Sequence, residues 1–298
     1  MKIRAHAARA CFGMYFFEKR WIMIGLFNFN GFSGVAKRLS AVCAAFALVS
    51  SAASALTNDE AKALLKKAED STAFYETDFT ASYEVVQERP GDGRSKTNAT
   101  IYRRDKTSNW TILILSPAKD KGKGYLQTDN TIWFYDPADR RFTFSSSKDK
   151  FQGTNANTSD FAPMFFTRDY KIESFSDVKL GAYDCVAYSL RATSKDVDYP
   201  VLKVWVSKND GLMRKKEDYS LSGQKLRTTA IPAYQPVSYG SETHQIPVSM
   251  VIQDNLKGKK MNGKMSYERT LISISNAVLK KQDDAVYTKP YLELMSGR

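Results

Sequence analysis

The spacing of apolar residues predicts one N-terminal helix followed by many strands. A period of three to four residues begins behind Thr57 and Glu60, which have the spacing of a capping box, and it predicts a helix over residues 58–75. From Asp78 the period changes to two, the side-chain alternation of a β-strand. The helical face comprises Ala61, Leu64, Leu65, Ala68 and Thr72, and the first alternating run comprises Phe79, Ala81, Tyr83 and Val85.

Short turns separate the alternating runs that follow. Asp129-Asn130, the proline-containing stretch 136–139 and Asn209-Asp210-Gly211 all have residue types that favour tight turns. The run 109–115 has few polar positions, so we expect it to be a strand buried on both faces. Short strands at such regular intervals predict a mainly β (α+β) domain built on a curved antiparallel sheet.

A last hairpin is expected near the C-terminal end. Residues 247–253 and 264–273 would be its strands, and the basic, glycine-containing stretch 257–264 would be the loop between them. A weak helix is expected over residues 287–295. The composition does not change along residues 56–298, so we expect them to form a single domain.

Residues 147–168 interrupt the strand pattern. Polar loop residues at 153–160 precede an apolar cluster, which predicts a loop carrying a short helix. Two interpretations stay open: the segment is a lid over a cavity, or it is a plug in an ordinary core. The candidate lid residues are Phe161, Met164, Phe165 and Phe166.

Residues 1–55 have the features of a signal peptide. Lys37-Arg38 precedes an apolar run at 39–49, and Ala53-Ser54-Ala55 is a small-residue cleavage site, so export and cleavage near Ala55 are expected. The part before Lys37 is long for a signal peptide, which is explained if the start is mis-assigned. An uncleaved anchor is the alternative. Cys43 lacks the neighbours of a lipid-attachment site, so we expect a soluble mature protein.

Composition and charge exclude most catalytic chemistries. Without residues 1–55 the chain keeps 37 basic and 31 acidic residues, one cysteine (Cys185) and one histidine (His244). An internal disulfide and a histidine-built zinc site or triad are therefore excluded. No glycine-rich nucleotide motif, nucleophile elbow or CxxC pair occurs. We therefore expect no enzyme, with no catalytic residue, metal or cofactor.

Three basic runs, at 119–123, 214–216 and 257–260, need a separate explanation. They are either solvated surface or a contact with an anionic membrane, to which each nearby lysine or arginine adds about 1 kcal/mol of attraction. Nucleic acid is not an expected partner of an exported chain.

An aromatic-rich curved sheet without catalytic groups favours lipid binding. Each buried CH₂ contributes about 0.8 kcal/mol, so a chain of about 16 carbons gives a gross term above about 10 kcal/mol. By parity, Trp133 and Tyr135 share one face, although the pattern leaves open which face points inward and whether it is ordinary core. The candidate cavity residues are Trp110, Ile112, Ile114, Trp133, Tyr135, Phe142, Phe144 and Trp205.

Several stretches carry a resemblance to a known family. They are Ala99–Asp105, Asn109–Thr111, the Trp-Phe-Tyr-Asp-Pro turn at 133–137 within Asn130–Phe142, and Thr288–Leu292. The sequence resembles the outer-membrane lipoprotein-sorting family of LolA/LolB-like periplasmic carriers, most densely over residues 95–165.

The resemblance implies an unclosed β-barrel with helices covering its opening. It further implies a monomeric periplasmic carrier of lipoprotein acyl chains or other lipids, between an inner-membrane transporter as donor and an outer-membrane acceptor. In such carriers an arginine after an early apolar strand governs cargo retention and release. Arg103 or Arg104 falls at this place, with Asp105 where the family has proline.

Two other functions remain open. A non-catalytic accessory protein of an envelope transporter or cell-surface complex would have a filled core and a stable protein partner. A lipid-processing hydrolase would need a nucleophile beside a base, and His244 has no evident partner in a stretch expected to be a loop.

Overall fold

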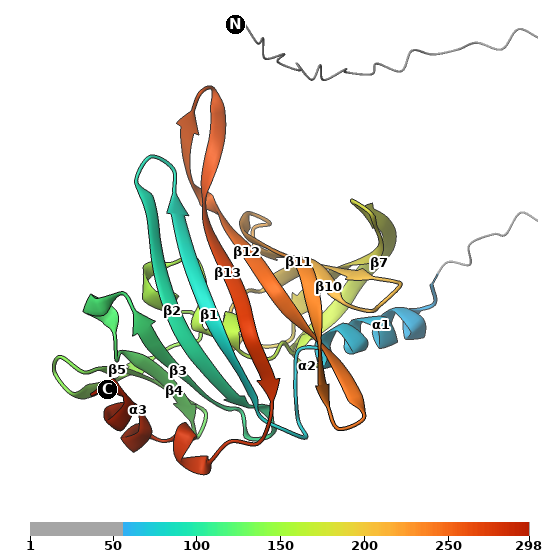
Figure 1. The fold of residues 1–298 in the computed structure, drawn as a ribbon. Coiled ribbons are helices and arrows are strands. Elements are labelled where there is room, and N and C mark those ends of the chain that lie inside the picture. Colours follow the sequence, from blue (N-terminus) through green and yellow to red (C-terminus); the bar gives the residue numbers. More distant parts are fainter. Residues whose placement is uncertain (1–55, 298) are drawn as a thin grey trace, which may run out of the picture. The chain divides into compact units, whose positions relative to one another are not determined.

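Thirteen antiparallel strands form a single sheet in the computed structural model, which describes residues 56–297 (Figure 1). The order is β6-β5-β4-β3-β2-β1-β13-β12-β11-β10-β9-β8-β7, so β6 and β7 are the two edges and the sheet stays open. This confirms the expected unclosed antiparallel sheet. The predicted leader lies outside the described residues. The strands are β1 (Phe79–Arg89), β2 (Gly93–Arg104), β3 (Asn109–Ser116), β4 (Gly124–Thr128), β5 (Thr131–Asp136), β6 (Arg141–Ser145), β7 (Tyr170–Leu180), β8 (Tyr183–Ala192), β9 (Val201–Ser207), β10 (Met213–Tyr219), β11 (Lys225–Tyr239), β12 (Glu242–Met261) and β13 (Lys264–Leu279).

Three α-helices accompany the sheet within residues 56–297: α1 (Asn58–Asp70), α2 (Phe166–Asp169) and α3 (Lys289–Ser296). The predicted capping box starts α1, because the Thr57 hydroxyl accepts from the Glu60 amide and the Glu60 carboxylate accepts from the Thr57 amide. The helix ends at Asp70, before the expected residue 75. There the Ser71 and Thr72 hydroxyls donate to carbonyls one turn back, at 2.8 Å each. Within residues 56–297, no helix is long and apolar enough to cross a membrane.

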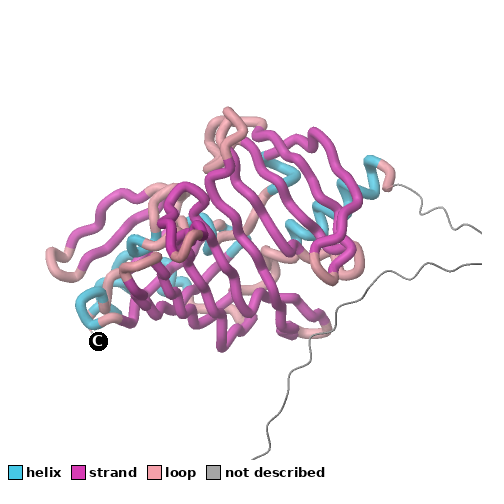
Figure 2. The backbone as a smooth tube through the Cα atoms, turned by 90° about the horizontal axis from the view of Figure 1, so that it is seen from above, coloured by secondary structure: helices cyan, strands magenta, loops and turns pink. Residues whose placement is uncertain are grey.

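The inner face of the sheet, which carries α1 and α2, holds the main hydrophobic core (Figure 2). Register places Ala81 of β1 opposite Ile101 of β2, and Ile101 opposite Ile112 of β3. All three side chains are buried. Alternation along each strand therefore forms a continuous apolar wall, as the period of two predicts.

On the outer face of the sheet, α3 covers part of the surface. Leu292 of α3 packs in a second buried cluster with Leu113, Leu126 and Tyr135. The β3 strand is consequently buried on both faces, as its lack of polar positions predicts: Ile112 points into the inner core and Leu113 under α3. The short C-terminal helix runs over Lys289–Ser296, close to the expected range.

The last hairpin is longer than the sequence predicts. The expected loop over 257–264 is wrong, because β12 continues to Met261 and β13 begins at Lys264. Asn262 and Gly263 alone make the turn, with φ of 49° and 79°. Asparagine and glycine accept these left-handed angles, so the two strands pair up to the tip.

Candidate functional site

Residues 146–169, here called the crossing segment, lie across the inner face of the sheet (Figure 1). The segment contains two 3₁₀ turns, Phe151–Gly153 and Thr158–Phe161, and the short helix α2. Phe151 packs against Tyr125 of β4 with ring centroids 5.5 Å apart, and Phe161 packs against Tyr83 of β1 at 5.7 Å. Burial raises the pKa of Tyr83 to about 12. The segment therefore covers the apolar wall in this structure.

The four candidate lid residues all belong to the crossing segment. Phe161 and Phe166 are fully buried in the inner core, and Met164 packs against its edge. Phe165 is half-buried, and the Arg168 guanidinium lies 3.8 Å from the centre of its ring. The segment is thus part of the core and covers the apolar wall, and its function as a lid stays a prediction.

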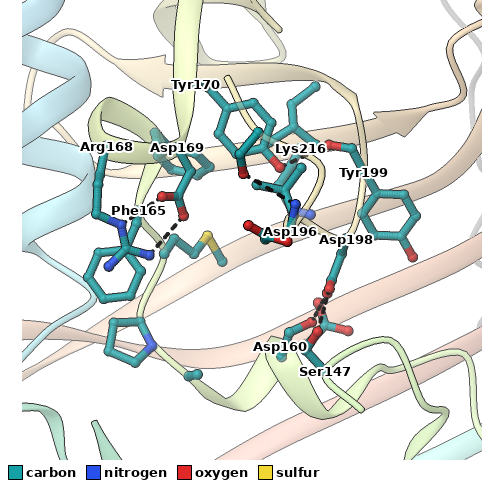
Figure 3. Close-up of a pocket in the computed structure, with 18 of the residues that line it drawn as sticks. Ser147, Asp160, Phe165, Arg168, Asp169, Tyr170, Asp196, Asp198, Tyr199 and Lys216 are labelled. Atoms are coloured by element: carbon teal, nitrogen blue, oxygen red, sulfur yellow. Dashed lines mark hydrogen bonds and ion pairs between the residues drawn. The ribbon is translucent and has the colours of Figure 1, made fainter. Parts of the chain in front are cut away.

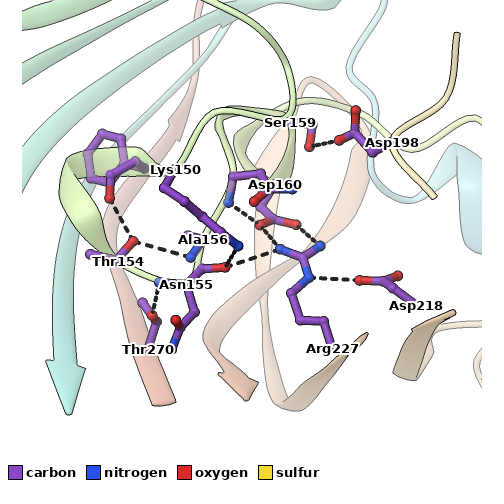
Figure 4. Close-up of polar contacts among 12 residues, drawn as sticks. Lys150, Thr154, Asn155, Ala156, Ser159, Asp160, Asp198, Asp218, Arg227 and Thr270 are labelled. Atoms are coloured by element: carbon purple, nitrogen blue, oxygen red, sulfur yellow. Dashed lines mark hydrogen bonds and ion pairs between the residues drawn. The ribbon is translucent and has the colours of Figure 1, made fainter. Parts of the chain in front are cut away.

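A buried ion-pair cluster fastens the crossing segment to the sheet (Figure 4). Arg227 of β11 donates to both carboxylate oxygens of Asp160, at 2.6 and 2.9 Å. Its Nε donates to Asp218 of β10 at 2.7 Å, and Lys216 donates to the other oxygen of Asp218 at 2.5 Å. The Arg227 side chain is only 3% exposed. These charge-assisted bonds are the strongest polar class available to hold the segment.

The acid–base state of this cluster follows from its neighbours. Burial alone would raise the pKa of Asp218, but Lys216 and Arg227 outweigh the burial and hold this pKa below its usual value. The pKa of Arg227 is raised because Asp160 and Asp218 outweigh its desolvation. Asp218 and Arg227 are therefore both charged at neutral pH.

A second polar anchor lies near the ends of β1 and β13. The Asn155 amide donates to the Thr270 hydroxyl at 2.8 Å and to the Gln87 side-chain oxygen at 3.1 Å. The Thr270 hydroxyl in turn donates to Gln87 at 2.5 Å. Thr270 and Gln87 are buried polar residues on the inner face of the sheet. They give the crossing segment a fixed register on the sheet.

The α1 helix is bound to the crossing segment and not only to the sheet. The Glu69 carboxylate accepts from the amide and the hydroxyl of Thr167, at 2.6 and 2.9 Å. The Thr72 hydroxyl accepts from the Met164 amide at 3.0 Å. The helix and the segment thus form one layer over the sheet, and displacement of one disturbs the other.

The two candidate arginines point to opposite faces. Arg103 lies on the inner face, 8% exposed, and pairs with Asp105 through two bonds of 2.6 and 3.0 Å. It also donates to the Thr72 carbonyl, just after α1, at 2.7 Å. Arg104 lies on the outer side, where it binds Asp78 at 2.8 Å. The aspartate that replaces the family's proline is therefore the partner of Arg103, and only Arg103 reaches the layer over the sheet.

A concave space of about 470 Å³ lies beside the crossing segment (Figure 3). Trp110 and Ile132 line it from one arm of the sheet, and Tyr199 and Leu202 from the other. Its size is that of a small-molecule site. Asp160, Arg168, Asp169, Asp196, Asp198, Lys216 and Arg227 also line it, so its wall is mixed rather than apolar as expected.

A second, smaller pocket is mostly apolar and lies beneath Met164. It measures about 50 Å³, and its wall includes Phe79, Ile246 and Ile274 of the sheet together with the Arg103 guanidinium. This volume holds one or two water-sized groups but no acyl chain. In this structure the apolar wall is occupied by the protein's own side chains.

The eight candidate cavity residues do not share one face. Trp110, Ile112 and Ile114 lie in the inner core. The other five require correction. Trp133, Tyr135 and Phe142 pack under α3 on the outer face. Phe144 is 77% exposed and stacks beside Trp133. Trp205 is half-buried under Lys215, and its neighbours along β9 are the residues that point inward.

The alternation of side chains along β5 explains why Trp133 and Tyr135 are not on the inner face. Trp133 and Tyr135 do share a face, but Ile132 and Phe134 are the β5 residues that pack on the inner core. The sequence shows no sign that α3 covers the outer face there. The Asp160–Arg227 pair was missed as well, although an arginine at an inward position of the alternating strand β11 is a usable signal.

No group of three metal-ligating side chains occurs within residues 56–297. His244 lies in β12 rather than in a loop, and its ring contacts the edge of Phe74 at a centroid distance of 5.4 Å. The Glu242 carboxylate lies 3.6 Å from the Nε2 atom of His244.

Comparison with solved structures identifies the fold. A LolA superfamily protein from Nitrosomonas europaea has a TM-score of 0.62 at 22% identity, covering 78% of this chain and 98% of its own. A putative outer membrane lipoprotein-sorting protein domain from Vibrio parahaemolyticus has a TM-score of 0.64 at 16% identity, covering 78% and 97%. A DUF1329 family protein from Desulfovibrio piger has a TM-score of 0.63 at 17% identity, covering 78% and 98%.

The resemblance to lipoprotein-sorting proteins is therefore confirmed for the fold. No curated protein matches the sequence. Residues 106–294 match a protein family described as uncharacterized, which is more than half of the chain. The chain belongs to this family of uncharacterized proteins, and it has the fold of the LolA superfamily.

Proposed function

We propose that the protein is a periplasmic carrier that holds lipid acyl chains against the inner face of its sheet. The observation that carries the proposal is the arrangement of the inner face. A continuous apolar wall is covered by a separate layer, α1 and the crossing segment, which polar side chains fasten at a few points. The LolA-like fold supports the same function.

Cargo entry requires the crossing segment to move, because the pocket beneath Met164 is too small for an acyl chain. Phe151, Phe161 and Phe166 would leave the wall, and acyl methylenes would replace their rings. Both occupants are apolar, so the exchange costs little hydrophobic free energy. The exchange is opposed by the free-energy cost of breaking polar contacts such as the Asp160–Arg227 ion pair. The strength of these contacts sets how tightly the crossing segment closes over the wall.

Arg103 is the better candidate of the two arginines for cargo retention and release. It joins the inner face to the carbonyl of Thr72 at the end of α1, whereas Arg104 faces away from the layer. Movement of α1 would break the bond to Thr72 and leave the bond to Asp105 intact. Arg103 would then be free to meet a polar cargo group at the edge of the wall.

The partners of a carrier follow from its chemistry. The proposed cargo is a lipoprotein or another lipid with acyl chains, delivered by an inner-membrane transporter and passed to an outer-membrane acceptor. The protein would act as an exported monomer without cofactor or catalysis. The competing function is an accessory protein of an envelope complex, in which the crossing segment is a permanent plug.

A fluorescent fatty acid distinguishes these two functions. The carrier should bind the probe saturably, and Phe161→Ser should weaken retention because the cover then packs less well. Leu221→Ser, an exposed apolar residue on the β10–β11 turn, serves as the control and should leave retention unchanged. A protein that refuses the probe while remaining folded would be a plugged accessory protein.

A further inference from the structure

The β12–β13 hairpin projects beyond its neighbours in the sheet (Figure 1). The β11 strand pairs with β12 only as far as Asp254, and β1 pairs with β13 only from Arg269. Residues 255–268, here called the projecting hairpin, therefore have no ladder partner on β11 or β1, and their ladder pairs run within the hairpin from Gly258 and Tyr267 to Met261 and Lys264. Two isolated strands are marginally stable in water, so a hairpin of this length gains from a partner.

Apolar side chains are exposed on the projecting hairpin. Leu256, Met261 and Met265 are 55%, 42% and 53% exposed. Met261 pairs across the strands with Lys264, and Met265 pairs with Lys260. Adjacent pairs of a ladder point to opposite faces, so each face of the tip carries one methionine and one lysine. Apolar groups on both faces fit insertion of the tip into an apolar medium, rather than docking of one face on a protein.

The charge of the projecting hairpin has one sign. Its lysines are Lys257, Lys259, Lys260 and Lys264, all exposed, and its single acid is Glu268 at the base. None of these lysines forms an ion pair with another residue of the described chain. Long lysine side chains keep their ammonium groups at a polar boundary while their stems lie along apolar surface. The hairpin thus combines exposed apolar groups with unpaired positive charge.

The turn between β1 and β2 extends this basic end of the molecule. A side chain placed on Gly91 would meet the Lys259 ammonium at 2.9 Å, so the two tips are neighbours. A recess of about 280 Å³ between them is lined by Arg89, Arg94 and Arg269. Arg94 and Arg269 share one carboxylate, that of Glu88, at 2.5 and 2.8 Å. The region has excess positive charge near the tip.

We propose that the projecting hairpin docks the protein on the surface of an anionic lipid bilayer. Leu256, Met261 and Met265 enter the boundary of the acyl chains, and the four lysines contact the anionic headgroups. Neither a cavity nor bound cargo is needed for this contact. The inference therefore does not rest on the carrier function, and the two can fail separately.

Sedimentation with lipid vesicles tests the docking. The protein is purified after export, and its intact mass establishes that the apolar leader is gone. Vesicles of phosphatidylcholine alone are compared with vesicles of three parts phosphatidylcholine to one part phosphatidylglycerol. We expect strong binding only to the anionic vesicles, with affinity falling as salt is added.

Two hairpin variants and one control separate charge from insertion. Replacing all four hairpin lysines with glutamine should weaken binding about a hundredfold or more, since each contributes about fivefold. The variant Leu256→Ser, Met261→Ser, Met265→Ser should weaken binding at least about tenfold at every salt concentration. The control, Leu221→Ser with Lys280→Gln and Lys281→Gln, changes exposed residues of the same types elsewhere and should bind as the unaltered protein does.

The outcomes decide the proposal. Equal binding to neutral and anionic vesicles, equal binding by the lysine variant, or no binding at all would each overturn it. Far-ultraviolet circular dichroism shows whether each variant retains its fold. Vesicle binding by a protein that takes up no fatty acid would remove the carrier function and leave the docking intact.

Discussion

The guanidinium of Arg227 and the carboxylate of Asp160 form a two-bond ion pair that joins the sheet to its cover, at 2.6 and 2.9 Å. Arg227 also binds Asp218 on the neighbouring strand, so it stays paired when the Asp160 contact breaks. A partner that remains after opening lowers the cost of opening. The pair is therefore suited to a cover that releases and closes again.

Weakening this pair should speed entry of cargo. We expect Asp160→Asn to raise the rate of fatty-acid uptake about tenfold, because a charge-assisted bond contributes about 1.5 kcal/mol or more in the closed state. Stopped-flow fluorescence measures the rate. The matched control is Glu173→Gln on β7, which removes the charge of an exposed carboxylate that pairs with Arg191 of β8. A rate for Asp160→Asn no higher than that of the control would show that the pair does not gate entry.

Removing the arginine has a different consequence, since it leaves the buried carboxylate of Asp160 without its ionic partner and that of Asp218 with Lys216 alone. We expect Arg227→Met to lower the free energy of unfolding by about 3–5 kcal/mol. Arg191→Met, which breaks an exposed pair, should change it by less than about 1 kcal/mol. Urea unfolding followed by tryptophan fluorescence gives both values. Similar losses in the two variants would contradict the importance assigned to the buried cluster.

The lowered pKa values of Asp218 and Asp78 predict acid sensitivity. Arg104 and neighbouring donors hold the pKa of Asp78 below its usual value despite its burial. A carboxyl group whose pKa is lower in the folded state stabilises the fold above its unfolded pKa of about 3.9, and this stability is lost as the pH falls through the folded value. The free energy of unfolding should therefore fall below about pH 4.

A substitution isolates the contribution of Asp218. We expect Asp218→Asn to flatten the dependence of unfolding free energy on pH below about 4, because one such group is gone. Asp92→Asn, at an exposed turn position, should leave the slope as it is. Chemical denaturation at a series of pH values provides the curves. Identical slopes for Asp218→Asn and the unaltered protein would contradict the assignment.

The aromatic residues of the outer face should not affect cargo. Trp133 lies under α3 with the Lys289 ammonium 3.3 Å from the centre of its ring. Trp133→Ala should therefore lower stability by about 3 kcal/mol through loss of packing, with fatty-acid affinity unchanged. Phe134→Ala, one residue along and on the inner face, should alter affinity as well. If the Trp133 variant lost fatty-acid binding and the Phe134 variant did not, the cargo would bind the outer face, and the proposed inner-face site would be wrong.

Local signals predicted much of the fold. The Thr57–Glu60 capping box placed the start of α1, and the alternation from Phe79 onward predicted the apolar wall. The helical period overran the end of α1 by five residues, because the hydroxyls of Ser71 and Thr72 terminate the helix there. Similarly, the lysines around Asn262-Gly263 favour a longer loop in the sequence, although these two residues alone form the turn.

The site was less predictable because its contacts are distant in sequence. Asp160 and Arg227 are far apart along the chain, and no local pattern links them. Parity showed that Trp133 and Tyr135 share a face, but only the packing of α3 decides that this face is the outer one. Likewise, the choice between Arg103 and Arg104 follows from the direction of each side chain on β2.

Native mass spectrometry of the purified protein, followed by analysis of whatever it releases, shows whether the protein carries acyl chains. We expect a population carrying a lipid or an acylated polypeptide, and Asp160→Asn should carry less after dilution because its cover opens more readily. A protein that is always empty, and that stays empty when offered acyl probes, would contradict it. The crossing segment would then be a permanent part of the core.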